Sequence, residues 1–234
     1  MFLDTLGKAR AVLKADLHIH TEYSMDCTVS LKQVINRCLE KGINCIAVAD
    51  HGTVEGALKI REIAPFKVIV AEEILTPHGE IMGLFLNKTI PSGISVEQAI
   101  SEIKAQGGLV CIPHPFDRFR KSALDGNMLE EIIQHVDIIE IWNSRITLKG
   151  DILKAQALAQ KYGITGSAGS DAHTLHEVGN AYVEMTEFDS CEDFLRALNA
   201  GKLVGHRTNP LVHFGSSLAR VKGNFRKKLN MIGH

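Results

Sequence analysis

The stretch Asp16-Leu17-His18-Ile19-His20-Thr21 decides how this chain is organised. The apolar run Ala11-Val12-Leu13 leads into it, so the two histidines stand at the end of a first predicted β-strand. Alternate residues of a strand point to the same face, which places His18 and His20 side by side. Two imidazoles on one face repel each other when protonated and are stable mainly as neutral ligands, so the pair indicates a metal site. The alternative is a pair of surface or core histidines placed by chance.

Apolar segments of strand length recur along the chain and alternate with segments of helical pattern. The segments predicted as further strands are 43–49, 67–71, 81–86, 109–112, 137–142 and 164–168, with helices at about 30–41, 54–63, 95–106, 128–135 and 149–162. Ser30 with Gln33, and Ser95 with Gln98, are capping-box pairs that mark two of the helix starts. This alternation predicts an α/β fold with a parallel sheet of about seven strands, most simply closed as a (β/α) barrel. An open doubly wound sheet is the alternative.

Polar side chains stand at or just beyond the carboxyl ends of these strands. They are His18, His20, Asp50, His51, Glu73, His114, Asp171 and His173. Active sites of (β/α) barrels are built at that face, so the pattern favours the barrel over the open sheet. Imidazole and carboxylate ligands without thiolates suit zinc, manganese or iron. The candidates are enough for two or three ions, a number typical of enzymes that displace groups at phosphorus.

Composition narrows the class of protein. With 234 residues, of which 45% are hydrophobic, the chain can bury a full core, and we expect residues 1–234 to form a single domain. No apolar run reaches the length of a membrane span and the first residues do not resemble a secretory signal, so we expect a cytoplasmic protein. The cysteines are scattered without a Cys-x-x-Cys pair, which indicates reduced packing residues: Cys27, Cys38, Cys45, Cys111 and Cys191.

The charge is distributed unevenly along the chain. The formal net charge of -1 argues against a general nucleic-acid-binding protein. No acidic residue follows Asp193, so the segment 194–234 is strongly basic. This basic segment either steers anionic substrates, contacts nucleic acid, or is a solvated end of the chain.

Five short motifs follow one another along the chain. They are Asp16–Thr21, Ala49-Asp50-His51, Ala71-Glu72-Glu73-Ile74, Pro113-His114-Pro115 and Gly169-Ser170-Asp171-Ala172-His173. In this order they resemble the motifs of the PHP (polymerase and histidinol phosphatase) superfamily over roughly residues 15–185. The resemblance implies a distorted (β/α) barrel of the PHP type that holds up to three divalent metal ions at the carboxyl ends of its strands.

Carried over residue by residue, the resemblance also implies a ligand set. The implied ligands are His18, His20, Glu73 and Asp171 for a first ion, Glu73 and His114 for a second, and Asp26, His51 and His173 for a third. Asp26 stands where many members have a histidine. Glu73 is chosen over Glu72 because it directly precedes Ile74-Leu75-Thr76, and alternation lets only one of the two face the site. Members with a fuller set have one more histidine on the second ion, for which this chain offers only Glu80 or His78.

Residues around the implied ligands are given supporting roles. Asp16 and Asp50 are expected to hold the histidines in place as hydrogen-bond acceptors rather than to bind metal. Because a guanidinium fork binds phosphate in a bidentate way, arginines near the strand ends are candidate phosphate ligands. The candidates are Arg118, Arg120, Arg145 and Arg207, with His206 beside the last, and each is otherwise a solvated surface charge.

The implied activity is hydrolysis of a phosphomonoester of a small metabolite or nucleotide by a metal-bound hydroxide, with two to three zinc, manganese or iron ions as cofactors. No further catalytic side chain is assigned. One alternative is a nuclease or phosphodiesterase acting on single-stranded nucleic acid, for which the basic segment is the only support. Others are a non-catalytic RNA–protein subunit of the same fold and, outside the family, an amidohydrolase barrel. The sequence determines neither the substrate nor the oligomeric state.

Overall fold

Strand β1 (Val12–Ile19) carries the two histidines of the opening stretch at and just beyond its carboxyl end, as the sequence predicts. The structure is a computed structural model that describes residues 11–207. The larger part of the basic segment 194–234, and with it the three interpretations of that segment, therefore lies outside the described residues.

Nine strands and six α-helices make up the described part of the chain. After β1 the strands are β2 (Cys45–Val48), β3 (Lys67–Thr76), β4 (Gly79–Leu84), β5 (Leu109–Ile112), β6 (Ile138–Asn143), β7 (Thr165–Gly169), β8 (Ala181–Thr186) and β9 (Lys202–Gly205). The helices are α1 (Leu31–Lys41), α2 (Glu55–Ile63), α3 (Val96–Ala105), α4 (Gly126–Ile132), α5 (Lys149–Tyr162) and α6 (Cys191–Asn199), and a 3₁₀ helix (Ile133–His135) follows α4. The five predicted helices are all present, whereas α6 was not predicted.

Both capping boxes are confirmed. The side chains of Ser30 and Ser95 each accept a hydrogen bond from the backbone N–H three residues on. The side-chain oxygen of the glutamine at that position accepts in turn from the backbone N–H of the serine. Gly42 and Gly163 end α1 and α5 in the left-handed conformation that glycine adopts without strain.

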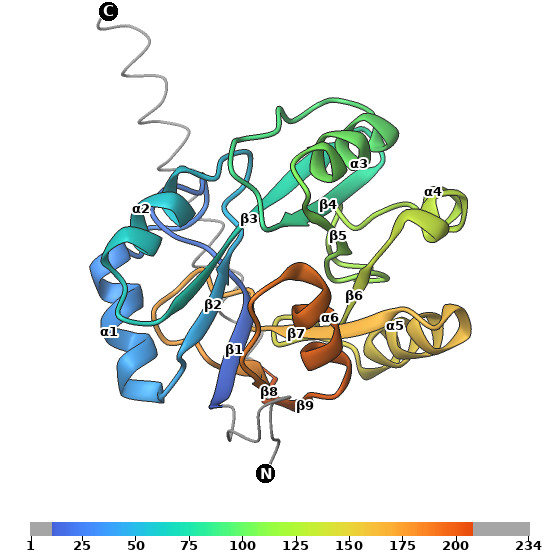
Figure 1. The fold of residues 1–234 in the computed structure, drawn as a ribbon. Helices are drawn as coiled ribbons and strands as arrows, with labels where there is room; N and C mark the ends of the chain where they lie inside the picture. The colour runs from blue at the N-terminus through green and yellow to red at the C-terminus, as the bar shows by residue number, and fades with distance from the viewer. Residues whose placement is uncertain (1–10, 208–234) are drawn as a thin grey trace, which may run out of the picture.

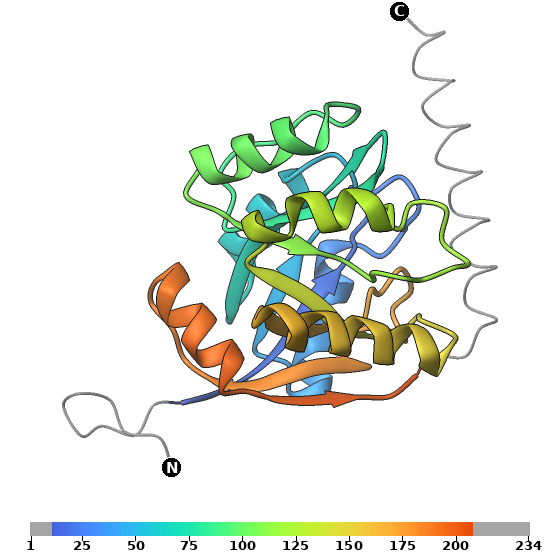
Figure 2. The same ribbon diagram turned by 90° about the vertical axis from the view of Figure 1, so that its right-hand side faces the viewer.

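The nine strands form one mixed sheet in the order β7-β6-β5-β4-β3-β2-β1-β8-β9 that curls into a nearly closed barrel. Helices α1 to α5 cover its outside, whereas α6 packs on the other face of the sheet (Figure 1), and the view in Figure 2 looks onto the flank covered by α4 and α5. The barrel is closed at one end, where the backbone N–H of Asp171 donates to the oxygen of His18 at 2.7 Å and that of His20 donates to Ala172 at 3.0 Å. The predicted α/β barrel is confirmed.

Two features of the sheet differ from the prediction of about seven parallel strands. Strand β4 runs antiparallel to both β3 and β5, because only Pro77 and His78 connect it to β3 and a parallel neighbour needs a long crossover. Strands β8 and β9 add an antiparallel pair beside β1. Residues 181–186 show the alternating burial of a half-covered strand, a signal that their sequence already contains.

A bulge in β1 turns the two histidines into the barrel. Leu13, Ala15 and Leu17 belong to a hydrophobic cluster on the face of the sheet opposite the helices α1 to α5, whereas Ile19 belongs to the cluster under those helices. The pairing of β1 with β2 shifts register between Asp16 and Ile19, which exchanges the two faces. Bulges commonly re-aim side chains beside active sites in this way.

Candidate metal centre

The side chains that the sequence assigns to metal lie together at the carboxyl ends of β1, β2, β3, β5 and β7. We call them, with Glu80 from β4, the ligand cluster: His18, His20, Asp26, His51, Glu73, Glu80, His114, Asp171 and His173. Four groups within it each bring their ligand atoms within 4.8 Å of one another: His20–Asp26–His51–His173, His18–His20–Glu73, His18–His114–Asp171 and His51–Glu73–Glu80. All but the partly exposed His51 are buried.

Glu73 is at the centre of the ligand cluster. Its Oε1 lies 2.7 Å from Nε2 of His114, and its Oε2 lies 3.4 Å from Nε2 of His20 and 3.3 Å from Nδ1 of His51. The adjacent Glu72 points to the other face of β3, where its Oε2 accepts a hydrogen bond from the backbone of Ile90 at 2.8 Å. Alternation along β3 thus brings Glu73, and not Glu72, to the cluster.

His18 is oriented by Glu140, a buried carboxylate on β6. Glu140 Oε1 lies 3.1 Å from Nδ1 of His18, which leaves Nε2 of that ring facing His20. Glu140 Oε2 accepts from the backbone N–H of His114 at 2.7 Å. Gly169 permits the close approach of β7, because a Cβ there would come within 2.3 Å of the Cβ of His18. The predicted site omits Glu140; its only sequence signal is a charged residue inside an apolar strand.

Asp16 and Asp50 are expected to hold the histidines in place as hydrogen-bond acceptors, and Asp16 accepts from the backbone N–H of His18 at 3.4 Å. Asp16 accepts from the backbone N–H groups of Ser170 at 2.8 Å and Gly179 at 2.9 Å. Asp50 accepts from the backbone and the hydroxyl of Thr21, both at 2.6 Å. Burial raises the pKa of each carboxyl to about 6. The two aspartates therefore fix the loops that follow β7 and β1, because backbone donors reach them before any imidazole does.

Of the candidate arginines, Arg120 enters the ligand cluster. Its guanidinium lies 3.2 Å from Nε2 of His114 and donates to Oδ2 of Asp171. Arg118 points elsewhere and pairs with Asp151 at the start of α5, at 2.8 Å. The difference is local, because successive side chains of this loop leave it in different directions.

Of the remaining phosphate-binding candidates, only Arg145 is shown to contact the ligand cluster. Arg145 is buried against His173, with its Nη1 2.6 Å from Nδ1 of that ring and its Nε 3.3 Å from Glu177. His206 and Arg207 follow β9 and are exposed; the backbone N–H of His206 donates to Asn180 at 2.7 Å. The geometry makes Arg145 a support for His173 rather than a group open to solvent.

The electrostatics of the ligand cluster keep some histidines neutral and the carboxylates charged. Burial, together with the neighbouring His173, lowers the pKa of His20 to about 3. Burial disfavours the charge on Asp171 and Glu73, yet Arg120 and His18 hold the pKa of Asp171, and His18 and His51 that of Glu73, well below their usual range. The neighbouring carboxylates in turn raise the pKa of His18 well above its usual value and that of His51 to about 9 despite their burial. A bound cation would displace the protons from these two rings, because metal ligation requires the neutral imidazole.

Orphaned atoms show that this donor set fits cations. Among residues 11–207, buried Oε2 of Glu73, Oε2 of Glu80 and Oδ1 of Asp171 have no hydrogen-bond partner. Buried carboxylate oxygens are rarely left unsatisfied, because the desolvation cost is not recovered. Each lies within 4 Å of at least one histidine nitrogen of the cluster. Oxygen and nitrogen ligands that converge without hydrogen bonding are the arrangement that a divalent ion completes.

Backbone strain is concentrated at the same place. Four non-glycine residues of the described chain have positive φ, and two of them, His114 at 31° and Asp171 at 53°, belong to the ligand cluster. A third, Phe116, follows His114 by two residues. Strain of this kind persists where the surrounding structure holds a functional side chain in position.

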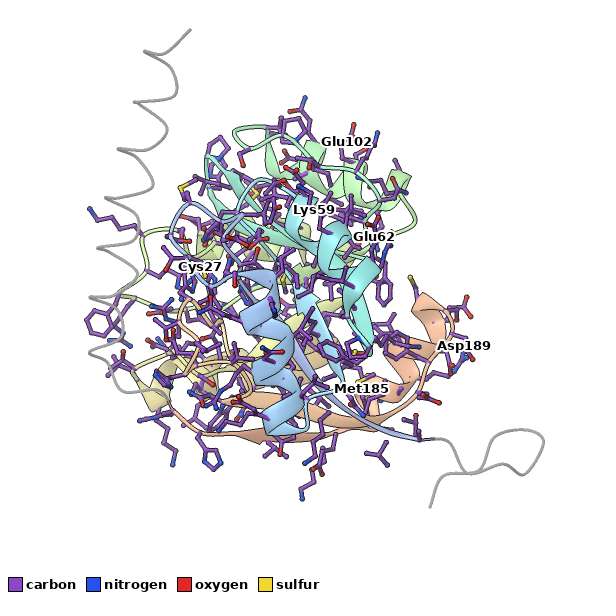
Figure 3. All side chains as sticks on the ribbon, turned by 90° about the vertical axis from the view of Figure 1, so that its left-hand side faces the viewer. Cys27, Lys59, Glu62, Glu102, Met185 and Asp189 are labelled. Carbon is purple, nitrogen blue, oxygen red and sulfur yellow. The ribbon has the colours of Figure 1, made fainter. Side chains whose placement is uncertain are left out.

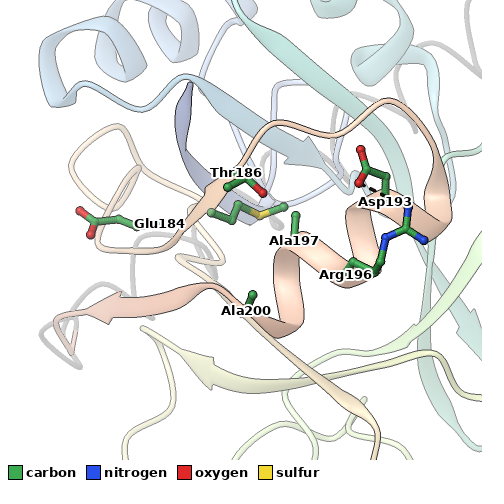
Figure 4. A pocket seen from close by; sticks show the side chains of 7 residues that line it. Glu184, Thr186, Asp193, Arg196, Ala197 and Ala200 are labelled. Carbon is green, nitrogen blue, oxygen red and sulfur yellow. Dashed lines mark hydrogen bonds and ion pairs between the residues drawn. The ribbon is translucent and has the colours of Figure 1, made fainter. Parts of the chain in front are cut away.

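Cavities elsewhere in the molecule do not involve the ligand cluster. One of about 130 Å³ lies between β8 and α6 and is lined by Glu184, Met185 and Arg196 among others (Figure 4). Another of about 370 Å³ is lined by residues that include Lys67 and Asp189.

Cys27, whose thiol contacts the backbone of His20 and His173, lies on the opposite side of the molecule from Asp189 (Figure 3).

None of the helices within residues 11–207 has the length and apolar character needed to cross a lipid bilayer.

Glu140→Gln is expected to weaken metal binding by about 10–100-fold, the usual cost of losing a group that orients a metal-binding histidine. The amide keeps the size of the carboxylate but presents a donor to an imidazole or to the backbone N–H of His114. Competition with a chromogenic chelator measures the affinity, and Glu184→Gln on β8 is the matched control. An affinity equal to that of the control would show that Glu140 does not act on His18.

Comparisons with known proteins agree with this geometry. Residues 16–89 match the model of the PHP domain, and residues 152–203 match that of a PHP-associated region. The chain is 33% identical over 247 residues to the uncharacterized protein MJ0417 of Methanocaldococcus jannaschii, an alignment that covers 94% of this chain and 100% of that protein.

Solved structures with the same fold are more distant in sequence. PsfC from Pseudomonas syringae superposes with a TM-score of 0.65 at 14% identity, over 90% of this chain and 98% of that one. A two-domain protein from Bacteroides vulgatus, described as containing a predicted PHP-like metal-dependent phosphoesterase, superposes with a TM-score of 0.61 at 18% identity, over 84% of this chain and 66% of that one.

Proposed function

Because the chain belongs to the PHP domain family, we propose that it is a metal-dependent phosphoesterase that hydrolyses a phosphomonoester of a small metabolite or nucleotide. The observation that carries the proposal is the ligand cluster, in which buried carboxylates and imidazoles surround Glu73 with Arg120 at its edge. Several adjoining donor groups with a nearby guanidinium are suited to a phosphoryl group, whose charge must be neutralised during displacement.

The donor groups support two or three ions. We assign His18, His20, Glu73 and Asp171 to one ion, Glu73, Glu80 and His114 to a second, and Asp26, His51 and His173 to a third. In this assignment, Glu80 takes the place of the additional histidine that members with a fuller ligand set have at the second ion. Its Oε2 lies 3.7 Å from Nε2 of His114. Mixed imidazole and carboxylate sets suit zinc, manganese or iron.

The protein's own residues position the substrate and hold its charge. Divalent ions in such a site supply an activated water molecule and neutralise the phosphoryl oxygens. Arg120 carries a permanent charge at the same place, and its fork can bind two phosphoryl oxygens while Asp171 keeps it in position. Glu140 holds His18, and Arg145 holds His173, so that both rings keep one orientation through the reaction.

The alternative functions gain less support. The nuclease hypothesis depended on the basic segment, most of which lies outside the described residues. A non-catalytic subunit has no need of a buried donor set, and retaining one has a desolvation cost that bound ions would offset. The ligand cluster is nearly complete, so we favour an enzyme.

The test is a phosphate-release assay on protein stripped of metal and reloaded separately with Mn²⁺, Zn²⁺ or Fe²⁺. Metal content is measured on each preparation, and phosphomonoesters and phosphodiesters are compared as substrates. We expect metal-dependent release of phosphate from monoesters. Failure of every fully loaded preparation to hydrolyse any phosphate ester would sink the proposal, and hydrolysis of diesters alone would favour the nuclease.

A further inference from the structure

Asn143, the last residue of β6, is fully buried beside the ligand cluster and is not among the residues that the sequence assigns to the site. Its side-chain Nδ2 donates to Oε2 of Glu140 at 2.9 Å and to Oδ2 of Asp171 at 3.2 Å. Its Oδ1 accepts from the backbone N–H of Arg145 at 2.9 Å. Because both hydrogens and the oxygen of the amide are bonded, the side chain is held in one orientation.

A bulge in β6 brings Asn143 to the same face as Glu140. Residues three apart on a regular strand point to opposite faces. Here the register of β6 against β7 shifts between Glu140 and Trp142, where Ile141 is an extra residue. Gly166 on β7 leaves room for it, because a Cβ there would come within 2.3 Å of the Ile141 side chain. Two polar side chains of one strand thus reach the ligand cluster together.

The amide determines which oxygen of Asp171 is free. Oδ2 of Asp171 accepts from the amide of Asn143 and from the guanidinium of Arg120. Oδ1 has no hydrogen-bond partner among the described residues, and it lies 3.3 Å from Nε2 of His20 and 3.7 Å from Nε2 of His18. The lone pairs that remain for a cation are therefore those of Oδ1, which faces two of the rings assigned to the first ion.

Of the two donors to Oδ2 of Asp171, Asn143 is the more rigidly held. Arg120 stands in a loop and its side chain is 16% exposed, whereas Asn143 is buried and ends a strand. A guanidinium that turns toward a phosphoryl group gives up part of its contact with Asp171. The uncharged amide does not compete for that group, so it keeps the carboxylate in place.

The other hydrogen of the amide joins Asp171 to the support of His18. Oε2 of Glu140 accepts from Asn143 and from the backbone N–H of His114 at 2.7 Å, while Oε1 lies 3.1 Å from Nδ1 of His18. The amide stands between two buried carboxyl groups and offers one hydrogen to each. One side chain of β6 thus links ligands that come from β1, β5 and β7.

We propose that Asn143 is a positioning residue of the metal centre, which holds Asp171 so that Oδ1 faces the first ion and joins that carboxylate to Glu140. The inference rests on the proposed phosphoesterase function and its ligand assignment. Asn143 binds no ion itself and acts through the ligands that it holds. The loss of a hydrogen-bond partner of this kind typically weakens metal binding by about 10–100-fold.

The test replaces Asn143 by leucine, which has a similar branched shape, and by alanine, which is smaller; neither offers a donor. Competition of the protein with a chromogenic chelator measures the number of Mn²⁺ or Zn²⁺ ions bound per chain and their dissociation constants. In both variants we expect one ion to bind about 10–100-fold more weakly and the others to bind as in wild type. We also expect the visible absorption bands of the Co²⁺-loaded protein to change, because its carboxylate ligand is displaced.

Asn44→Leu is the matched control. Oδ1 of Asn44 accepts from the backbone N–H of Lys14 at 2.7 Å, and its Nδ2 donates to the oxygen of Val12 at 3.3 Å, so this amide also joins two segments of the sheet, but at the amino end of β1. The control should lower stability without changing metal affinity or the Co²⁺ absorption bands. Asn143→Gln retains the amide and should recover part of the affinity and of the wild-type absorption.

Circular dichroism shows which variants are folded, and Asn143→Ala decides if Asn143→Leu is not. Wild-type affinity and absorption in the folded variants, or an equal weakening of every ion, would overturn the inference. Failure of both variants to fold would do the same, because it would make Asn143 a structural residue. The measurements need no ester. A wild type that binds ions but releases no phosphate would therefore remove the proposed function and leave the role of Asn143 to be decided by the metal titrations.

Discussion

Glu73→Gln is expected to lower kcat/KM for phosphate release by about a thousandfold or more and to reduce the amount of bound metal. Glu73 belongs to two of the four donor groups, and its two oxygens approach the side chains of His114, His20 and His51. Glutamine keeps the volume of the side chain but offers one neutral acceptor in place of a bidentate anion. Its carboxylate lies between histidines from three other strand ends, so no neighbouring carboxylate can take its place.

Glu72→Gln is the matched control for this variant. The residue is adjacent, buried and of the same type, but it faces Ile90 on the other side of β3. Elemental analysis of metal content and steady-state kinetics are compared for both variants, with circular dichroism as the check of folding. Equal activity of Glu73→Gln and Glu72→Gln would remove Glu73 from the centre of the site.

Removal of metal is expected to have the second large effect, on stability. The ligand cluster brings four carboxylates together: Asp26, Glu73, Glu80 and Asp171. Within the described residues, the guanidinium groups that contact the cluster are those of Arg120 and Arg145. Ions that bind the folded chain and not the unfolded one stabilise it by about 4 kcal/mol when free metal is about a thousand times the dissociation constant. For a chain of this length that corresponds to about 8–16 °C in Tm.

Thermal unfolding of protein treated with chelator, and then titrated with Mn²⁺ or Zn²⁺, measures this shift. The Glu73→Gln variant should show a smaller rise in Tm than wild type over the same titration, because its second oxygen ligand is lost. A Tm that does not change with any divalent ion, in protein that remains folded, would contradict the assignment of the cluster as a metal centre.

The sequence is sufficient to predict the barrel and the ends of its strands. Each apolar run is short and is followed within two residues by a polar side chain, so the carboxyl edge of the sheet could be predicted without knowing how the strands pair. The reversal of β4 was missed because the residues of β4 are as apolar as those of a parallel strand. The bulge between Asp16 and Ile19 was also invisible, since it depends on pairing with β2 and not on any residue in β1.

The candidate site divides in the same way. Ligands that follow a strand, such as His51 and Asp171, could be named because the strand fixes where they lie. Arg118 and Arg120 could not be distinguished, because they stand in a loop whose turns have no period, and only the pairing of Arg118 with Asp151 separates them. Glu80 reaches Glu73 across a hairpin, so its place depends on the antiparallel register of β3 and β4.

Closure of the barrel between β1 and β7 has a consequence for the order of folding. The ligand cluster takes side chains from residue 18 to residue 173, and the backbone bonds of His18 and His20 to Asp171 and Ala172 join segments that are far apart in the chain. Contacts of such long sequence separation are the slowest to form. Bound ions would meet their full set of donors only after this step, so we expect them to slow unfolding and to leave the rate of folding nearly unchanged. The supply of metal would then set the lifetime of the native state, whereas the chain would reach that state without it.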